Sequence, residues 1–188
     1  MRQVQSGLAR TVGLVAWLLV LGGCTTVSVS ADWDPSANLA SLRTWAWQQD
    51  AIPRTGDPRL DDPLVQARIQ NAVEHALGEM GHPELAAGKP DFYVSYHIAI
   101  QQKLDARTIY RDYGPYRGWY GAGGAQTIVD EYELGMLLVD FIDPKTNSVI
   151  WRGKAQSRLQ ELKTPEERQA RVQAAVDQLL AQFPPKSR

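Results

Sequence analysis

The chain has 188 residues, of which 44% are hydrophobic and 22% are charged, and its formal net charge is −1. This composition is typical of a globular protein, and its weakly acidic balance offers no general attraction for nucleic acid or anionic lipid. The length suits one domain. The only cysteine, Cys24, has no partner for an intramolecular disulfide, so hydrophobic packing must hold the domain together.

Residues 1–23 are predicted to be a secretory signal peptide. Arg2 and Arg10 make its start positive, residues 12–21 form a short apolar run, and two glycines precede Cys24. The run is shorter than the roughly 20 apolar residues of a transmembrane helix. The stretch resembles a lipobox, in which the cysteine is diacylated on sulfur, becomes the first residue after cleavage, and is then acylated on its amine. The alternative is an ordinary signal peptide with a chance cysteine.

Residues 24–188 are then expected to form one lipid-anchored α/β domain with a net charge of −3, because two arginines leave with the signal peptide. Stable anchoring needs more than one acyl chain, which a lipoprotein amine and thiol together provide. The residue after the cysteine is Thr25 rather than Asp, which in proteobacteria favours the periplasmic face of the outer membrane. The first strand starts near Val27, so we expect the domain to sit close to its membrane.

The first half of the domain reads as two strands and a helix. Residues 27–33 and Thr44–Trp47 are rich in strand-forming residues, and residues 50–61 form a loop broken by proline and glycine. Asp62 is a good N-cap, proline follows at the first helical position, and apolar residues then recur at helical spacing. Gly81 is predicted to end this helix.

The second half reads as three strands and a helix. Residues 92–101 alternate in polarity as a half-buried strand does, and residues 128–142 form a long extended stretch with Leu134, Met136 and Leu138 on one face. Asp143–Asn147 is a tight turn into a partner strand that runs from Val149 through Ala155. Thr164–Glu167 matches a capping box before the last apolar stripe, which ends at Pro184-Pro185.

These elements predict an α/β (α+β) two-layer sandwich in the order ββαβββα. Hairpin turns favour a mainly antiparallel sheet of about five strands, with both helices packed on one face. Trp45, Trp47 and Trp151, together with Val149, have the strand parity of core residues. We therefore interpret the tryptophans, including Trp33, as core side chains rather than as a stacking site for a ligand.

Several segments, taken in order, resemble the bacterial lipoprotein family known as domain of unknown function 4136. They span nearly the whole mature chain and are Val29–Asp34, Thr44–Trp47, Asp91–Val94, Gly135–Asp140, Val149–Gly153 and the terminal helix that runs into Phe183-Pro184-Pro185. The resemblance implies the localisation and the fold. It carries over no catalytic residue, because the family has no assigned activity.

No catalytic or metal-binding motif stands out. His75, His82 and His97 lack the spacing of a metal site, so we predict no metal and no cofactor. Acidic residues cluster at 61–62, 130–133 and 140–143. Asp62 suits a helix cap and Asp143 a turn, so the sequence identifies no pair of carboxylates for acid–base catalysis. The sequence also lacks a nucleophile elbow and a P-loop.

One segment, at about 110–125, is too rich in glycine for regular structure and too aromatic for a plain linker. Long loops in compact domains often carry function, and tyrosine, tryptophan and arginine are favoured in recognition sites. The candidate partner-binding residues are Tyr110, Arg111, Tyr113, Tyr116, Arg117, Trp119 and Tyr120. The alternative is a connection between two strands that binds nothing.

Two classes of function remain. The first is a non-catalytic envelope lipoprotein that binds a protein, glycan or lipid partner, or assists assembly. The second is an envelope hydrolase with an unrecognised active site. The first is favoured because each polar cluster has a structural explanation. A pocket that gathers His97 or paired carboxylates would favour the enzyme, and a flat sheet with a protruding 110–124 loop would favour the binding module.

Overall fold

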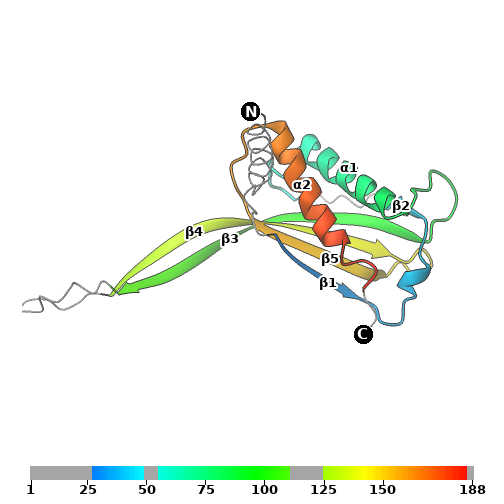
Figure 1. Ribbon diagram of the computed structural model, residues 1–188, viewed down its shortest axis with the longest axis horizontal. Helices are drawn as coiled ribbons and strands as arrows, with labels where there is room; N and C mark the ends of the chain where they lie inside the picture. The colour runs from blue at the N-terminus through cyan, green and yellow to red at the C-terminus, as the bar shows by residue number, and fades with distance from the viewer. Residues whose placement is uncertain (1–26, 49–54, 111–124, 186–188) are drawn as a thin grey trace, which may run out of the picture.

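The computed structural model describes residues 27–48, 55–110 and 125–185, with 106–110 and 125–128 described through their backbone. The predicted signal peptide, Cys24 and residues 111–124 lie outside these residues. Five strands form one sheet in the order β1-β5-β4-β3-β2, and two long helices cover one of its faces (Figure 1). The elements are β1 Ser28–Trp33, a 3-10 turn Leu39–Ser41, β2 Trp45–Trp47, α1 Pro63–Glu79, β3 Phe92–Tyr110, β4 Ala125–Ile142, β5 Val149–Arg158 and α2 Pro165–Leu180.

The predicted two-layer sandwich with ββαβββα order is confirmed. The sheet is mainly antiparallel, since β1 pairs with β5, β5 with β4, and β4 with β3 in that sense. The short edge strand β2 is the exception and runs parallel to β3, because α1 crosses over between them. Asp91 fixes this parallel pair: its carboxylate accepts hydrogen bonds from the backbone nitrogens of Arg43 and Thr44, both at 2.9 Å.

Both helices begin where their sequence signals predict, and α1 also ends as predicted, whereas α2 ends at Leu180, before the predicted stop at Pro184-Pro185. The Asp62 carboxylate accepts from the Leu64 nitrogen at 2.8 Å, and α1 ends before Gly81, whose φ of +82° favours glycine. In α2, Thr164 and Glu167 form the predicted capping box, each side chain bonding the other's backbone nitrogen. These caps satisfy backbone donors that a helix start leaves without partners.

The core between sheet and helices is built on aromatic rings. Phe141 lies 4.5 Å from Phe92, 4.7 Å from Trp151 and 4.8 Å from Phe183, measured between ring centroids. Phe183, just beyond α2, thereby fastens the C-terminal helix onto the sheet. Gly153 lets α2 approach, because a Cβ there would lie only 2.5 Å from a Leu179 methyl carbon.

The tryptophans divide between core and surface. Trp45 and Trp151 are fully buried, as predicted, whereas Trp47 is half-buried and donates its indole N–H to Glu74 at 3.0 Å. Trp33 and Val149, expected in the core, are 43% and 42% exposed. A register irregularity between Phe141 and Ile142 explains Val149, because it changes the parity at the start of β5.

Candidate functional site

The most distinctive feature outside the core is a two-stranded arm formed by β3 and β4. Strand β2 pairs only with residues 92–94 of β3, and β5 pairs with β4 only from Leu134 onward. Within the described chain, residues 102–110 and 125–133 therefore form strand pairs only with one another, and one further backbone hydrogen bond joins the Leu159 nitrogen to the Glu133 carbonyl oxygen at 2.9 Å. Figure 1 shows this arm projecting away from the helices and the rest of the sheet. At 3.4 Å per residue, its nine residue pairs span about 30 Å.

None of the arm residues whose side chains the structure describes, 102–105 and 129–133, is buried. Leu104 is 71% exposed on β3, and Val129 is 56% exposed on β4. Both belong to the helix-side face by strand alternation, but they lie where no helix covers the sheet. The sequence predicted strands over 92–101 and 128–142, so the arm lengthens both. Tyr110, placed in the loop by the sequence, is the last residue of β3.

Arginines hold the base of the arm from both faces. On the helix side, Arg59 reaches Glu133 at 3.0 Å while also binding Asp57 at 2.8 Å. These two carboxylates raise the pKa of the Arg59 guanidinium, and Arg59 lowers the pKa of Asp57 through its hydrogen bonds. On the opposite face, the Arg158 guanidinium stacks over the Tyr132 ring.

Arg158 ends β5 beside the open face of the arm. Its guanidinium carbon lies 3.9 Å from the centroid of the Tyr132 ring, and one of its nitrogens lies 3.9 Å from Asp105 on β3. Arg158 thus contacts both strands of the arm. Sequence reasoning missed both arginine contacts, because Arg59 and Glu133 are 74 positions apart and no short motif links them.

Most of the predicted partner-binding residues lie beyond the end of the arm. Tyr110 ends β3 and pairs in register with Ala125, the first residue of β4. The remaining candidates lie outside the described residues, as does Cys24; they are Arg111, Tyr113, Tyr116, Arg117, Trp119 and Tyr120. The two strands of the arm thus lead directly into the segment that carries them.

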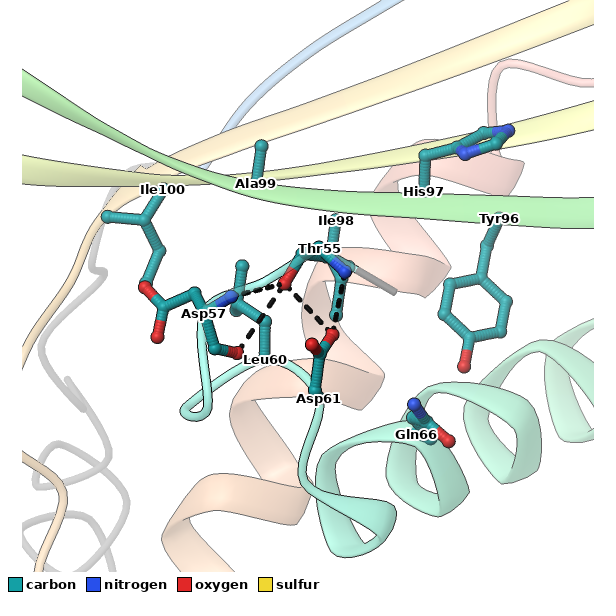
Figure 2. A pocket seen from close by; sticks show the side chains of 10 residues that line it. All are labelled: Thr55, Asp57, Leu60, Asp61, Gln66, Tyr96, His97, Ile98, Ala99 and Ile100. Carbon is teal, nitrogen blue, oxygen red and sulfur yellow. Dashed lines mark hydrogen bonds between the residues drawn. The ribbon is translucent and has the colours of Figure 1, made fainter. Parts of the chain in front are cut away.

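A hollow of about 350 Å³ lies beside β3, and a histidine and two carboxylates, the residue types that would favour an enzyme, line it. Asp57, Asp61 and His97 all line it, but Figure 2 shows His97 on the opposite side of the β3 ribbon from both carboxylates. Asp61 accepts from the Thr55 nitrogen and hydroxyl at 2.8 and 2.9 Å. Both carboxylates are therefore engaged in shaping the 55–61 turn rather than facing His97.

The hollow also contains a buried hydroxyl. Tyr96 is 1% exposed, and its hydroxyl oxygen has no hydrogen-bond partner in the described chain. Burial raises the pKa of this phenol. Its ring points to the same side of β3 as Asp61 and Gln66 (Figure 2).

His97 instead faces the open side of the sheet, near an ion pair of which only the carboxylate is buried. Arg152 binds both oxygens of Asp140 at 2.6 Å, and the His97 Nε2 lies 4.0 Å from the same carboxylate. Asp140 is 2% exposed, and its hydrogen bonds raise the pKa of Arg152. Because Arg152 occupies both oxygens, this carboxylate is arranged as a structural partner of the arginine.

The other two histidines are apart from this cluster. His75 is exposed and lies 3.6 Å from Glu79, and His82 is buried with its Nδ1 3.1 Å from the Arg43 carbonyl oxygen. Among the described residues, no group of three or more histidine, cysteine, aspartate or glutamate side chains could hold a metal ion.

An apolar groove of about 190 Å³ opens between the N-terminal ends of the two helices and the sheet. Val27, the first described residue, lines it together with Val65, Ile69 and Val172. Within the described chain, no helix is both long enough and apolar enough to span a bilayer.

Comparisons with known proteins identify a family and a fold. The family model described as "Domain of unknown function (DUF4136)" matches residues 29–185. No curated protein matches the chain. A PDZ domain protein from Parabacteroides distasonis is similar, with a TM-score of 0.53 and 14% identity over 87% of this chain, and this chain spans only 37% of that one.

Two structures of the PelC dodecamer from Paraburkholderia phytofirmans are also similar. Their TM-scores are 0.48 and 0.47, with identities of 11% and 9%. The matches cover 83% and 86% of this chain and 95% and 100% of the PelC chains. At these identities, the likeness to the Parabacteroides protein concerns the fold alone.

Proposed function

The chain belongs to the DUF4136 family, and from that premise we propose that it is a cell-envelope lipoprotein, anchored through Cys24, that acts as a non-catalytic binding or assembly module. The observation that carries the proposal is the β3–β4 arm. Its exposed apolar side chains, Leu104 and Val129, lie diagonally across the strand pair on one face, and adjoining exposed apolar groups rimmed by polar residues are typical of contact surfaces. The arm leads into the aromatic and arginine-rich segment 111–124.

The start of the domain supports an anchor close to the membrane. Strand β1 begins at Ser28, so the lipidated cysteine would be separated from the sheet by three residues, which span about 10 Å when extended. Val27 also lines the apolar groove at the end of the helices. We propose that the domain lies against the periplasmic face of the outer membrane and binds an envelope protein, glycan or lipid partner there.

An envelope hydrolase remains the second candidate, favoured by the approach of His97 to Asp140. Two observations weigh against it. Arg152 binds both oxygens of Asp140, and the carboxylates of the hollow lie across β3 from His97. A general base must reach a substrate proton within hydrogen-bond distance, and here the nearest carboxylate is engaged already.

Deletion of residues 111–123 from the native lipoprotein tests the binding module. We expect the deletion chain to keep its cooperative thermal transition and its membrane fraction, and to lose the proteins or glycans that co-purify after crosslinking in cells. The control chain keeps residues 111–123 and instead has Lys145, in the β4–β5 turn, replaced with alanine. Unchanged co-purification in the deletion chain would contradict the proposal.

The anchor is tested separately by labelling cells with an alkyne analogue of palmitate. We expect label on the native chain and none on a Cys24→Ser chain, which should also remain unprocessed or leave the membrane fraction. Label that persists on Cys24→Ser would place the acyl group elsewhere and contradict the assignment of Cys24.

A further inference from the structure

Strand β3 has an unpaired edge along most of its length. Strand β2 covers it only at residues 92–94, so in the described chain no strand pairs with its outer edge from Ser95 to Tyr110. The Val94 carbonyl accepts from Gln48 on the outer side. Because backbone groups alternate sides along a strand, the even-numbered residues of β3 direct their N–H and C=O groups to this edge. The register with β4 is continuous, so Leu104 belongs to that set.

An edge of this kind is a template for another strand. Two-stranded hairpins are marginally stable in water on their own, and a third strand adds stability. Charged side chains on an edge oppose pairing with a second copy when the pairing places like charges opposite one another. Here the most exposed apolar residue, Leu104, stands between Lys103 and Asp105, which have opposite charges.

We propose that two copies of this chain pair through their arms, β3 against β3 in antiparallel sense, with the two-fold axis at Leu104. In this register Leu104 forms a hydrogen-bonded pair with Leu104 of the second copy. The outward-facing N–H and C=O groups of both leucines are then hydrogen-bonded. The arms then form a four-stranded sheet with one domain at each end. Such an interface is isologous, because each copy contributes the same surface.

The charges of the arm fit this register. Lys103 lies opposite Asp105 of the second copy, and the symmetry repeats this pair on the other side of the axis. Directly opposed unlike charges stabilise a strand pair, whereas like charges destabilise it. Asp105 also lies 3.9 Å from Arg158, so Lys103 of the second copy would join an existing ion pair.

The register also gives a role to the hollow beside β3. It brings Tyr110 of the second copy opposite Ile98, and Ile98 lines the hollow together with Tyr96 and Ile100. The end of one arm would thus lie beside the hollow of the other copy. The inference deepens the proposed function, on which it rests, by naming a second copy as a partner of the arm.

Disulfide trapping in intact cells tests the register with the full lipoprotein. Directly opposed residues of a hydrogen-bonded pair have Cα atoms about 5.5 Å apart, which suits a disulfide. We expect Leu104→Cys to shift from monomer to disulfide-linked dimer on a non-reducing gel. Gln102→Cys is the matched control. Position 102 of one copy would lie about 14 Å along the strand from position 102 of the second copy, so this variant should stay monomeric. Co-expressed Gln102→Cys and Ala106→Cys chains should crosslink with each other.

A charge variant adds a second readout. Lys103→Glu in the Leu104→Cys background places like charges opposite each other, and we expect the dimer band to weaken, whereas Lys103→Arg should retain it. Equal dimer yields from Leu104→Cys and Gln102→Cys, or no effect of Lys103→Glu, would overturn the inference.

Failure of this inference is distinguishable from failure of the proposed function. The chain with no added cysteine should give no dimer, because lipid consumes the Cys24 thiol; a disulfide dimer of that chain would contradict the anchor instead. A monomeric Leu104→Cys chain whose arm still crosslinks to another envelope component would overturn self-pairing and leave the binding module standing.

Discussion

The Arg158 guanidinium lies over the Tyr132 ring at 3.9 Å from its centroid, where β5 ends and the arm begins. On the other face of the same strand, Arg59 binds Glu133 at 3.0 Å. The neighbouring positions 132 and 133 point to opposite faces, so one arginine holds each face. This arrangement fixes the direction of the arm relative to the sandwich.

Loss of the Arg158 contact should loosen the arm without unfolding the domain. A cation–π contact at an exposed site contributes about 0.5–1 kcal/mol, so Arg158→Ala should speed amide hydrogen exchange in residues 102–105 and 130–133. The melting temperature of the sandwich should change little. Lys145→Ala, which removes a cation from the far turn, is the control. Faster exchange throughout the sheet would argue that Arg158 supports the core instead.

The close approach of α2 to the sheet depends on Gly153. A Cβ at this position meets both Leu179 and the Trp151 ring at 2.5 Å, so Gly153→Ala should destabilise the fold by about 1–3 kcal/mol through overpacking. Gly78 in α1 has nothing within 4 Å of its built Cβ, and Gly78→Ala should stabilise by about 0.5–1 kcal/mol. Urea unfolding of both variants gives the comparison. If Gly153→Ala left the free energy of unfolding unchanged, α2 would be able to move away from the sheet without loss of stability.

The Asp140–Arg152 pair should be structural. Arg152→Leu leaves a buried carboxylate without its cation and should lower stability by about 2 kcal/mol, less than for a fully buried pair because water reaches the arginine. The double variant Asp140→Leu/Arg152→Leu should recover part of that loss. His97→Asn should leave stability and any envelope phenotype unchanged. A phenotype for His97→Asn with normal stability would revive the hydrolase hypothesis.

Asp91 should contribute to acid sensitivity. Hydrogen bonds from the Thr44 and Arg43 backbone lower the pKa of its carboxyl below the ordinary value of 3.8. Because the folded pKa is depressed, the contribution to stability is complete above the unfolded pKa and is lost as pH falls through the folded value. Denaturant unfolding between pH 5 and 3 should therefore show a weaker pH dependence for Asp91→Asn than for the native chain. Parallel curves would assign the acid sensitivity to other carboxylates.

The sequence predicted those parts of the fold that local chemistry determines. Asp62 and Thr164 mark helix starts by hydrogen bonds within a few residues, and Asp143 forms its turn by accepting from the Lys145 nitrogen at 2.6 Å. The alternation of residues 92–100 identified β3, because one of its faces is buried.

The parts that were missed depend on distant or exposed residues. The extension of β3 beyond residue 101 was not predicted, because Gln102, Lys103 and Leu104 are all exposed and alternation of polarity is not required there. The exposure of Val149 follows from a register irregularity between β4 and β5, which no local sequence motif predicts. The parallel placement of β2 depends on Asp91, which is 47 positions from Thr44. The ligand-binding role of the aromatic segment 111–124 stays a prediction.

Site-specific photocrosslinking in intact cells tests the central claim, that the arm is the contact surface of an anchored binding module. A photoreactive amino acid at Val129, which is 56% exposed on the arm, is compared with one at Leu64, which is 62% exposed on α1. We predict a discrete adduct from Val129 in the membrane fraction and none from Leu64. An adduct from Leu64 with none from Val129 would contradict the claim.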